Sequence, residues 1–210
     1  MNTFTPHTDQ SAPAAASAVL AKVKDRYGFI PNLAAYVAES PAALNGLMGL
    51  AGSFDATSLS PQEQQVVQLT VSVLNGCAYC RTVHAALGRK AALDDATLQA
   101  CISLTPLPDA RLNALRDFTR QVVEERGWVS EAAVAAFLGA GHTRAQVFEV
   151  LLGVAMKTFT NYSNHLRPND ISHNCYQVTK FDAQHAQLYL QLNQLLWSSL
   201  CVMIRLCTHC

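Results

Sequence analysis

The sequence predicts an all-α protein. Alanine and leucine dominate, and apolar residues recur at three- and four-residue spacing, which is typical of amphipathic helices. The period-two alternation of a β-strand is nearly absent. Hydroxyl and carboxylate residues stand directly before several apolar runs, where they would cap a helix start. Because half of its 210 residues are hydrophobic, the chain can form one domain with a substantial core.

In the first part of the chain, the sequence pattern predicts three helices after a disordered N-terminal segment. Residues 1–13 are polar and rich in Ala, Ser and Pro, so we expect disorder there. Gly28 would stop the first helix, and Pro41 would follow the second. The three expected helices cover residues 14–27, 33–38 and 42–54.

The clearest helix start is Ser60-Pro61-Gln62-Glu63. The serine is the N-cap, the proline takes the first helical position, and the glutamate can reach back to the cap amide. We expect this helix over residues 61–74, where Asn75-Gly76 forms a typical stop. A new helix should begin near Cys77 and run to about Ala91.

Caps divide the rest of the domain in the same way. Each of the next apolar runs follows a capping residue, namely Asp94, Asp109, Ser130 and Thr143. The helices expected after these caps cover residues 95–102, 110–126, 131–139 and 144–162. Together the predicted helices form one helical domain over residues 14–166.

The composition changes after this domain, and residues 167–210 are interpreted as a C-terminal extension of uncertain order. They are rich in Gln, Cys and Leu, with one candidate helix over residues 183–205. Four side chains near the end could in principle bind a metal: Cys201, Cys207, His209 and Cys210. Poor order, packing as one apolar helix and a shifted reading frame all remain open for this segment.

Charge and composition exclude several classes of function. Fifteen basic and fifteen acidic residues give a net charge of zero without a basic stripe, so we expect no nucleic-acid partner. The start lacks a secretory signal, and the longest apolar stretch, residues 195–206, is too short to span a bilayer. We therefore expect a cytoplasmic protein with no membrane partner. The high apolar fraction indicates surface buried between subunits, and thus a homo-oligomer.

The stretch from Asn75 to His84 points most directly to chemistry. Cys77 and Cys80 are three positions apart and His84 follows four positions later, so a helix would place all three on one face. A thiol reacts as the thiolate, whose formation is favoured at a helix N-terminus and beside a base. One thiolate could attack a peroxide to give a sulfenic acid, the second thiol could close a disulfide, and the histidine could take a proton.

Other interpretations of the same residues are open. The two cysteines could be small apolar residues of a helical core. A structural zinc site needs four ligands, and Cys77, Cys80 and His84 supply three, with no fourth close in sequence. A thioredoxin-like pair would need a βαβ context, which a chain without strand signals does not offer.

Several runs of this chain resemble one known superfamily. They are Leu59 to Glu63, Asn75 to Cys80 with His84, and Gly153 to His165. These runs are similar to the carboxymuconolactone decarboxylase / alkylhydroperoxidase D superfamily, in its thiol-bearing, peroxidase-related branch. The similarity covers about residues 19–166.

The resemblance implies an alkylhydroperoxidase D-like helical bundle that assembles as a trimer or hexamer. It implies peroxiredoxin-like reduction of small hydroperoxides, with no bound cofactor and with electrons from an unidentified dithiol donor. By the same resemblance, Cys80 attacks the peroxide, Cys77 resolves the intermediate and His84 belongs to a proton relay. Tyr79 occupies a position that belongs to the site in relatives.

One position departs from the family pattern. The family's relay glutamate falls twelve residues before the first cysteine, where this chain has Gln65. Glutamine cannot exchange a proton as a carboxylate can. Glu63 is two positions away, but the predicted capping box already accounts for it. Three consequences are open: a weakened relay, a bypass through water, or proton transfer by His84 alone.

Some weaker candidates lie outside this motif. Asn161, Asn164 and His165 could lie near the thiols or form polar contacts where the last core helix meets a neighbour. Cys101 lies on an apolar helix face, so we expect an inert thiol.

Three hypotheses for the function follow. The leading one is an enzyme that reduces hydroperoxides through the Cys77/Cys80 pair. The second is a lactone decarboxylase, the chemistry of the other branch of the superfamily, although that reaction has no use for a disulfide. The third is a non-catalytic redox sensor or binding subunit, which the glutamine at position 65 keeps open.

Overall fold

The computed structural model describes residues 4–166, and all regular secondary structure in this range is helical. The prediction of an all-α fold is therefore confirmed for this part of the chain. The candidate helix over residues 183–205 and the four candidate metal ligands near the C-terminus lie outside the described residues.

The helices follow the predicted order closely. They are α1 (Ala14–Tyr27), α2 (Asn32–Val37), α3 (Pro41–Asp55), α4 (Pro61–Leu74), α5 (Ala78–Lys90), α6 (Asp95–Ser103), α7 (Ala110–Glu124), α8 (Glu131–Gly139) and α9 (Arg144–His165). The ends of α1 and α4 coincide with the predicted ones. The largest differences are at α7, which ends two residues early, and at α9, which runs three residues past position 162.

Residues 4–13 lie against the first helices. The His7 ring is 2.9 Å from the Glu39 carboxylate, and Lys24 forms an ion pair of 3.0 Å with Asp9. The expected disorder of residues 1–13 stays a prediction.

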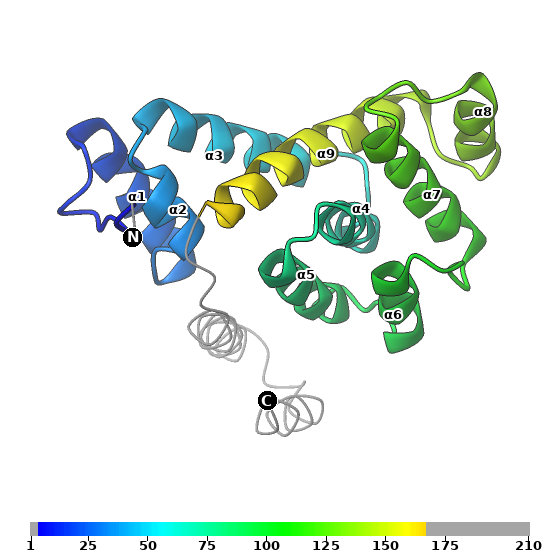
Figure 1. The fold of residues 1–210 in the computed structure, drawn as a ribbon, viewed down its shortest axis with the longest axis horizontal. Helices are drawn as coiled ribbons and strands as arrows, with labels where there is room; N and C mark the ends of the chain where they lie inside the picture. The colour runs from blue at the N-terminus through cyan, green and yellow to red at the C-terminus, as the bar shows by residue number, and fades with distance from the viewer. Residues whose placement is uncertain (1–3, 167–210) are drawn as a thin grey trace.

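Helix α4 lies at the centre of the bundle, and α9 runs from beside α7 to beside α2 (Figure 1). Helix α4 packs against α5, α7 and α9, while α3 lies along α9. The main apolar core forms around α4 and includes Phe54, Leu69, Leu115 and Phe118. A second, smaller cluster joins α1, α2 and the first half of α3.

A glycine permits the close packing of α9 on its neighbours. A Cβ atom at Gly153 would lie 2.5 Å from Phe54 Cε2 and 2.9 Å from Val67 Cγ1. Any larger residue would therefore push α9 away from α3 and α4. Since α9 carries several polar side chains toward α4 and α5, this contact also sets the geometry of the site described below.

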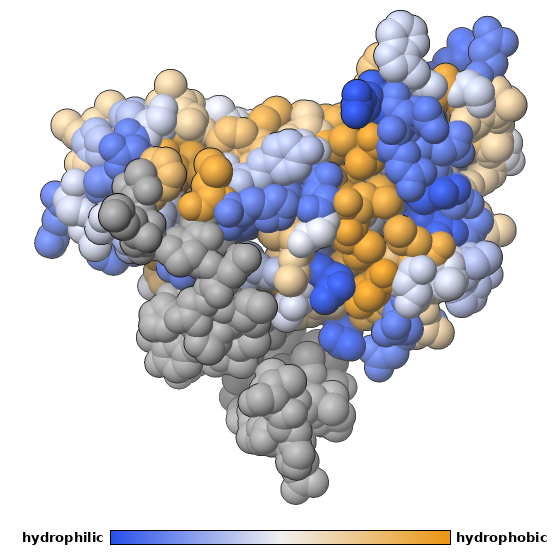
Figure 2. Space-filling model, viewed as in Figure 1, coloured by the Kyte–Doolittle hydropathy of each residue, from blue (hydrophilic) through white to orange (hydrophobic). Residues whose placement is uncertain are grey.

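The surface carries some large apolar side chains. Phe148 and Tyr162 on α9 are 72% and 56% exposed, and Trp128 after α7 is 88% exposed. Figure 2 shows apolar residues gathered on the face of the molecule between α4 and α7. In residues 4–166, no helix combines the length and the apolar character that crossing a membrane requires.

Candidate functional site

A turn between α4 and α5 positions the two thiols. Gly76 has a φ of 68°, in the left-handed region that glycine adopts readily. The Gly76 N–H donates to the Val73 carbonyl and the Cys77 N–H donates to the Ser72 carbonyl, which is the Schellman arrangement of a helix end. The same turn makes Cys77 the N-cap of α5, so one chain reversal ends α4 and presents the thiols at the start of α5.

The two sulfurs lie together at this helix start. Cys77 Sγ donates a hydrogen bond to Cys80 Sγ over 2.7 Å, and both thiols are free and buried. Cys80 sits in the first turn of α5, where backbone N–H groups have no carbonyl partner within the helix and the helix dipole is positive. Both factors favour a negative charge on Cys80.

The environment shifts the pKa values of the two thiols in opposite directions. The hydrogen bond from Cys77 is the largest cause that lowers the pKa of Cys80, and burial opposes it. The Lys157 charge and the amides of Asn161 and Asn164 add to the lowering, which brings the pKa of Cys80 to about 5. The same hydrogen bond, together with burial, raises the pKa of Cys77 well above its ordinary range. At neutral pH, Cys80 is therefore the thiolate and Cys77 the protonated thiol.

His84 is buried one turn after Cys80, and its ring binds two side chains from other helices. Nδ1 lies 2.9 Å from Gln65 Oε1 on α4, and Nε2 lies 2.5 Å from Lys157 Nζ on α9. An amide oxygen only accepts, so Nδ1 carries the hydrogen and Nε2 accepts from the lysine. Burial and then the Lys157 charge hold the pKa of His84 well below its ordinary value. His84 is therefore neutral at physiological pH.

Helix α9 supplies a row of site residues of which sequence reasoning identified only part. Lys157, Asn161 and Asn164 are buried and share one face of α9 at positions i, i+4 and i+7. Asn164 Nδ2 donates to Cys80 Sγ over 3.0 Å, and Asn161 binds Asn75 and Ser72 near the turn. Lys157 was not identified as a site residue from the sequence, although polar residues that share one face of an otherwise apolar helix form a recognisable pattern.

Gln65 and Glu63 point to different neighbours. Gln65 reaches His84 as described, so it lies at the position that the family resemblance assigned to the relay. Glu63 forms the predicted capping box with Ser60, and its Oε1 also pairs with Arg111 Nε over 2.9 Å. The interpretation of Glu63 as a cap is confirmed, and the ion pair with Arg111 is an additional role.

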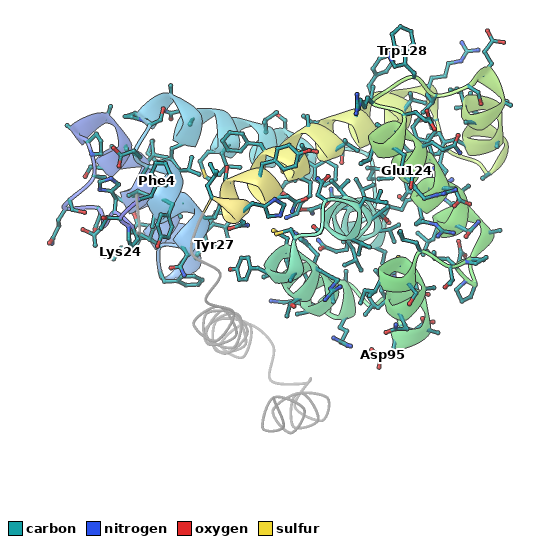
Figure 3. The ribbon with its side chains drawn as sticks, viewed as in Figure 1. Phe4, Lys24, Tyr27, Asp95, Glu124 and Trp128 are labelled. Atoms are coloured by element: carbon teal, nitrogen blue, oxygen red, sulfur yellow. The ribbon has the colours of Figure 1, made fainter. Side chains whose placement is uncertain are left out.

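An apolar cavity of about 270 Å³ adjoins the site. It lies between α1, α2 and α3 on one side and α5 and α9 on the other, with Tyr27, Leu47, Met48, Val83, Ala86 and Met156 among its walls. Tyr27, labelled in Figure 3, contributes from the last turn of α1. Tyr79 and Lys157 are polar members of the same wall, so the cavity meets the thiol site where these two side chains lie.

The remaining candidates lie elsewhere. Cys101 is fully buried in the main core, and burial raises the pKa of this thiol to about 11, as expected for an inert cysteine. His165 is exposed and lies beside the Tyr162 ring. Within residues 4–166, no three His, Cys, Asp or Glu side chains are arranged as metal ligands.

Comparison with protein families matches residues 38–120 to the carboxymuconolactone decarboxylase family. This range contains α4, the turn and both thiols. No curated protein matches the sequence.

Solved structures with the same fold include three informative neighbours. An uncharacterized peroxidase-related protein with an alkylhydroperoxidase AhpD core, from Ralstonia eutropha JMP134, is 21% identical with a TM-score of 0.69, over 80% of this chain and 93% of that one. The debrominase Bmp8, solved in complex with 2,3,4-tribromopyrrole, is 14% identical with a TM-score of 0.66, over 85% of this chain and 98% of that one. A putative antioxidant defence protein AhpD from Agrobacterium tumefaciens is 18% identical with a TM-score of 0.56, over 64% of this chain and 97% of that one. At these identities the likeness concerns the fold.

Proposed function

Because residues 38–120 match the carboxymuconolactone decarboxylase family and the fold is that of alkylhydroperoxidase D-like structures, we propose that the chain is a thiol peroxidase that reduces small organic hydroperoxides. One observation carries this proposal. Two buried sulfurs lie 2.7 Å apart at a helix start, and the hydrogen bond between them lowers the pKa of Cys80 and raises that of Cys77. A peroxidase of this kind needs a nucleophile and a second thiol that can displace the resulting hydroxide.

In the proposed reaction, the Cys80 thiolate attacks the terminal oxygen of the hydroperoxide. The S–O bond forms, the O–O bond breaks, and the alcohol leaves after taking up a proton. Cys77 then attacks the sulfenic sulfur, so that a disulfide forms and water leaves. A dithiol donor returns the pair to the reduced state by thiol–disulfide exchange.

The cavity supports an organic substrate. Its lining is mostly apolar, and its volume of about 270 Å³ suits a small molecule rather than a long chain. An alkyl or aryl group in this cavity would direct its peroxide group to the end where Lys157 and Tyr79 lie. Hydrogen peroxide would gain nothing from these walls.

Reaction of reduced protein with one equivalent of cumene hydroperoxide, followed by peptide mass spectrometry, tests the proposal. We expect a Cys77–Cys80 disulfide in the wild type and a trapped sulfenic acid on Cys80 in Cys77→Ser. Cys80→Ser should lose peroxide consumption, whereas Cys101→Ala, a matched buried thiol, should keep it. Unchanged consumption by Cys80→Ser would contradict the proposal.

A second function, a redox sensor, is favoured by one observation. Gln65 holds His84 without offering a carboxylate, which could limit the protein to one oxidation. Repeated turnover with excess dithiol identifies the enzyme. A disulfide that forms once and changes the elution volume in size-exclusion chromatography identifies the sensor.

We also propose a cytoplasmic homo-oligomer, a trimer or hexamer. The exposed apolar side chains of α9, Phe148 and Tyr162, support a surface that is buried between subunits. Light scattering of the purified protein should give a mass three or six times that of the chain, and a monomer mass would contradict this expectation.

A further inference from the structure

Lys157 is an unusual residue for its place in the fold. It lies in the middle of α9 with 5% of its surface exposed, although lysine is seldom fully buried unless it is paired. Within residues 4–166, its ammonium forms no ion pair with a carboxylate. The titratable groups that face it are His84, Cys80 and Cys77. The negative charge that balances it is therefore the Cys80 thiolate.

The hydrogen bonds at His84 decide where a mobile proton can reside. Nδ1 carries a hydrogen toward Gln65 Oε1, and Nε2 accepts from Lys157. A proton placed on Nε2 would create an imidazolium directly beside the ammonium, with no carboxylate behind it to stabilise the charge. His84 is thus poorly suited to receive a proton. Burial lowers the pKa of Lys157 while the facing thiols raise it, which suits its ammonium to give a proton to a group beside it.

Lys157 also reaches the place where a substrate would react. It lines the apolar cavity together with Tyr79, the residue before Cys80. An ammonium has three N–H donors, and the bond to His84 uses one of them. The lysine can thus serve both the imidazole and a group bound in the cavity.

We propose that Lys157 is the general acid of the reaction and protonates the oxygen that leaves when Cys80 attacks the hydroperoxide. His84 and Gln65 are positioning residues, since they hold the ammonium at the end of the cavity. This inference rests on the proposed peroxidase function and assigns the proton step within it. It also explains how a chain with glutamine at position 65 can complete the reaction.

The protons and electrons balance over a full cycle. The thiolate of Cys80 gives an electron pair to the terminal oxygen, and the alkoxide takes a proton from Lys157 to leave as an alcohol. Disulfide formation by Cys77 releases the sulfenic oxygen as water, with the proton that Cys77 carried. Reduction of the disulfide by two thiols of the donor regenerates the Cys77 thiol and the Cys80 thiolate. The remaining proton of the donor returns to the neutral Lys157 amine.

The test compares leaving groups in Lys157→Met. An alkoxide needs a proton to leave, whereas the carboxylate released from a peroxy acid does not. We expect single-turnover oxidation by cumene hydroperoxide to fall about 10²-fold or more in the variant, as when a positioned acid is lost. Oxidation by peracetic acid at pH 9, where the thiolate forms even without the lysine, should change by less than about fivefold. Lys22→Met, at an exposed lysine of α1, is the matched control.

The outcomes separate the possibilities. Equal losses with both oxidants would show that Lys157 only sets the thiolate or the fold, and no loss with either would also overturn the proposal. Alkylation of Cys80 by iodoacetamide at pH 9, together with thermal unfolding, checks that the variant is folded and its thiol accessible. A wild type that is alkylated but does not react with hydroperoxide would instead refute the peroxidase function itself.

Discussion

Lys157 Nζ lies 2.5 Å from His84 Nε2, although 73 positions separate the two residues in the chain. The contact joins α9 to α5 beside the thiols. The contact occupies the ring nitrogen that would accept a proton from a thiol, and burial together with the adjacent positive charge keeps the pKa of His84 well below its ordinary value. In the proposed mechanism, the histidine therefore acts by positioning the lysine.

The pKa of Cys80 should depend on Cys77. In Cys77→Ala the donated hydrogen bond is lost, which for a charged acceptor is worth about 1.5–3 kcal/mol, or about one to two pH units. We expect the pKa of Cys80 to rise by this amount from about 5. The thiolate is the reactive form, so alkylation of Cys80 slows as the pH falls below its pKa. In the variant, this slowing should begin at a higher pH than in the wild type.

The pH dependence of iodoacetamide alkylation, followed at Cys80 by mass spectrometry, measures this shift. Cys101→Ala is the control, since Cys101 lies in the core, away from the pair, and should leave the profile unchanged. An identical profile in Cys77→Ala would mean that the helix start and Lys157 suffice to stabilise the thiolate.

Gln65→Glu should restore a proton relay through His84. A carboxylate beside Nδ1 would stabilise the imidazolium and raise the pKa of His84. A positioned acid–base group accelerates a reaction by about 10²-fold or more. We expect the turnover rate with excess dithiol to increase by up to about this factor. A new ionisation near neutral pH should also enter the rate profile.

Steady-state rates over a range of pH test this expectation. Gln99→Glu makes the same substitution at an exposed site on α6 and should change neither the rate nor the profile. If Gln65→Glu behaves like this control, proton transfer through His84 does not limit turnover.

Filling the cavity should discriminate between substrates. Ala86 lies on α5 and lines the cavity, so Ala86→Leu would occupy part of the space for the organic group. A single methylene group in an apolar pocket already alters specificity by about 10- to 200-fold. We expect such a loss for cumene hydroperoxide and little change for hydrogen peroxide.

The ratio of kcat/KM for the two peroxides gives the result directly. Ala132→Leu, at an exposed position of α8, controls for the added side chain. If Ala86→Leu lowers kcat/KM equally for both peroxides, the organic group of the substrate does not bind in this cavity.

Gly153 should be intolerant of substitution. Gly153→Ala places a methyl group 2.5 Å from the Phe54 ring, and overpacking of this kind costs about 1–3 kcal/mol. Gly46 on α3 has nothing within 4 Å of an added Cβ atom, so Gly46→Ala should stabilise the protein by about 0.5–1 kcal/mol through helix propensity. Urea denaturation of the two variants should therefore give changes of opposite sign. A neutral Gly153→Ala would show that α9 can shift without cost.

Much of the secondary structure was predictable because its signals are local. Ser60, Pro61 and Glu63 specify the start of α4 within four residues, and the structure forms this capping box as expected. The ends of α7 and α9 were less well predicted. Helix α7 ends in a Schellman turn in which Arg126 has a φ of 53° and the Gly127 N–H donates to the Val122 carbonyl, so a non-glycine residue takes the left-handed position that the sequence would assign to glycine.

By itself, the sequence determined the helical fold, the turn at Gly76, and the spacing that puts Cys77, Cys80 and His84 on one face. It also marked Gln65 as the departure from the family pattern. Only the tertiary structure decided what surrounds these residues, because the contacts of Lys157 with His84 and of Asn164 with Cys80 join segments 73 and 84 positions apart. Local propensity cannot encode such contacts, which arise when α9 packs closely on α4 through Gly153. That packing places a buried charge beside the thiols, which adds to the hydrogen bond from Cys77 in lowering the pKa of Cys80.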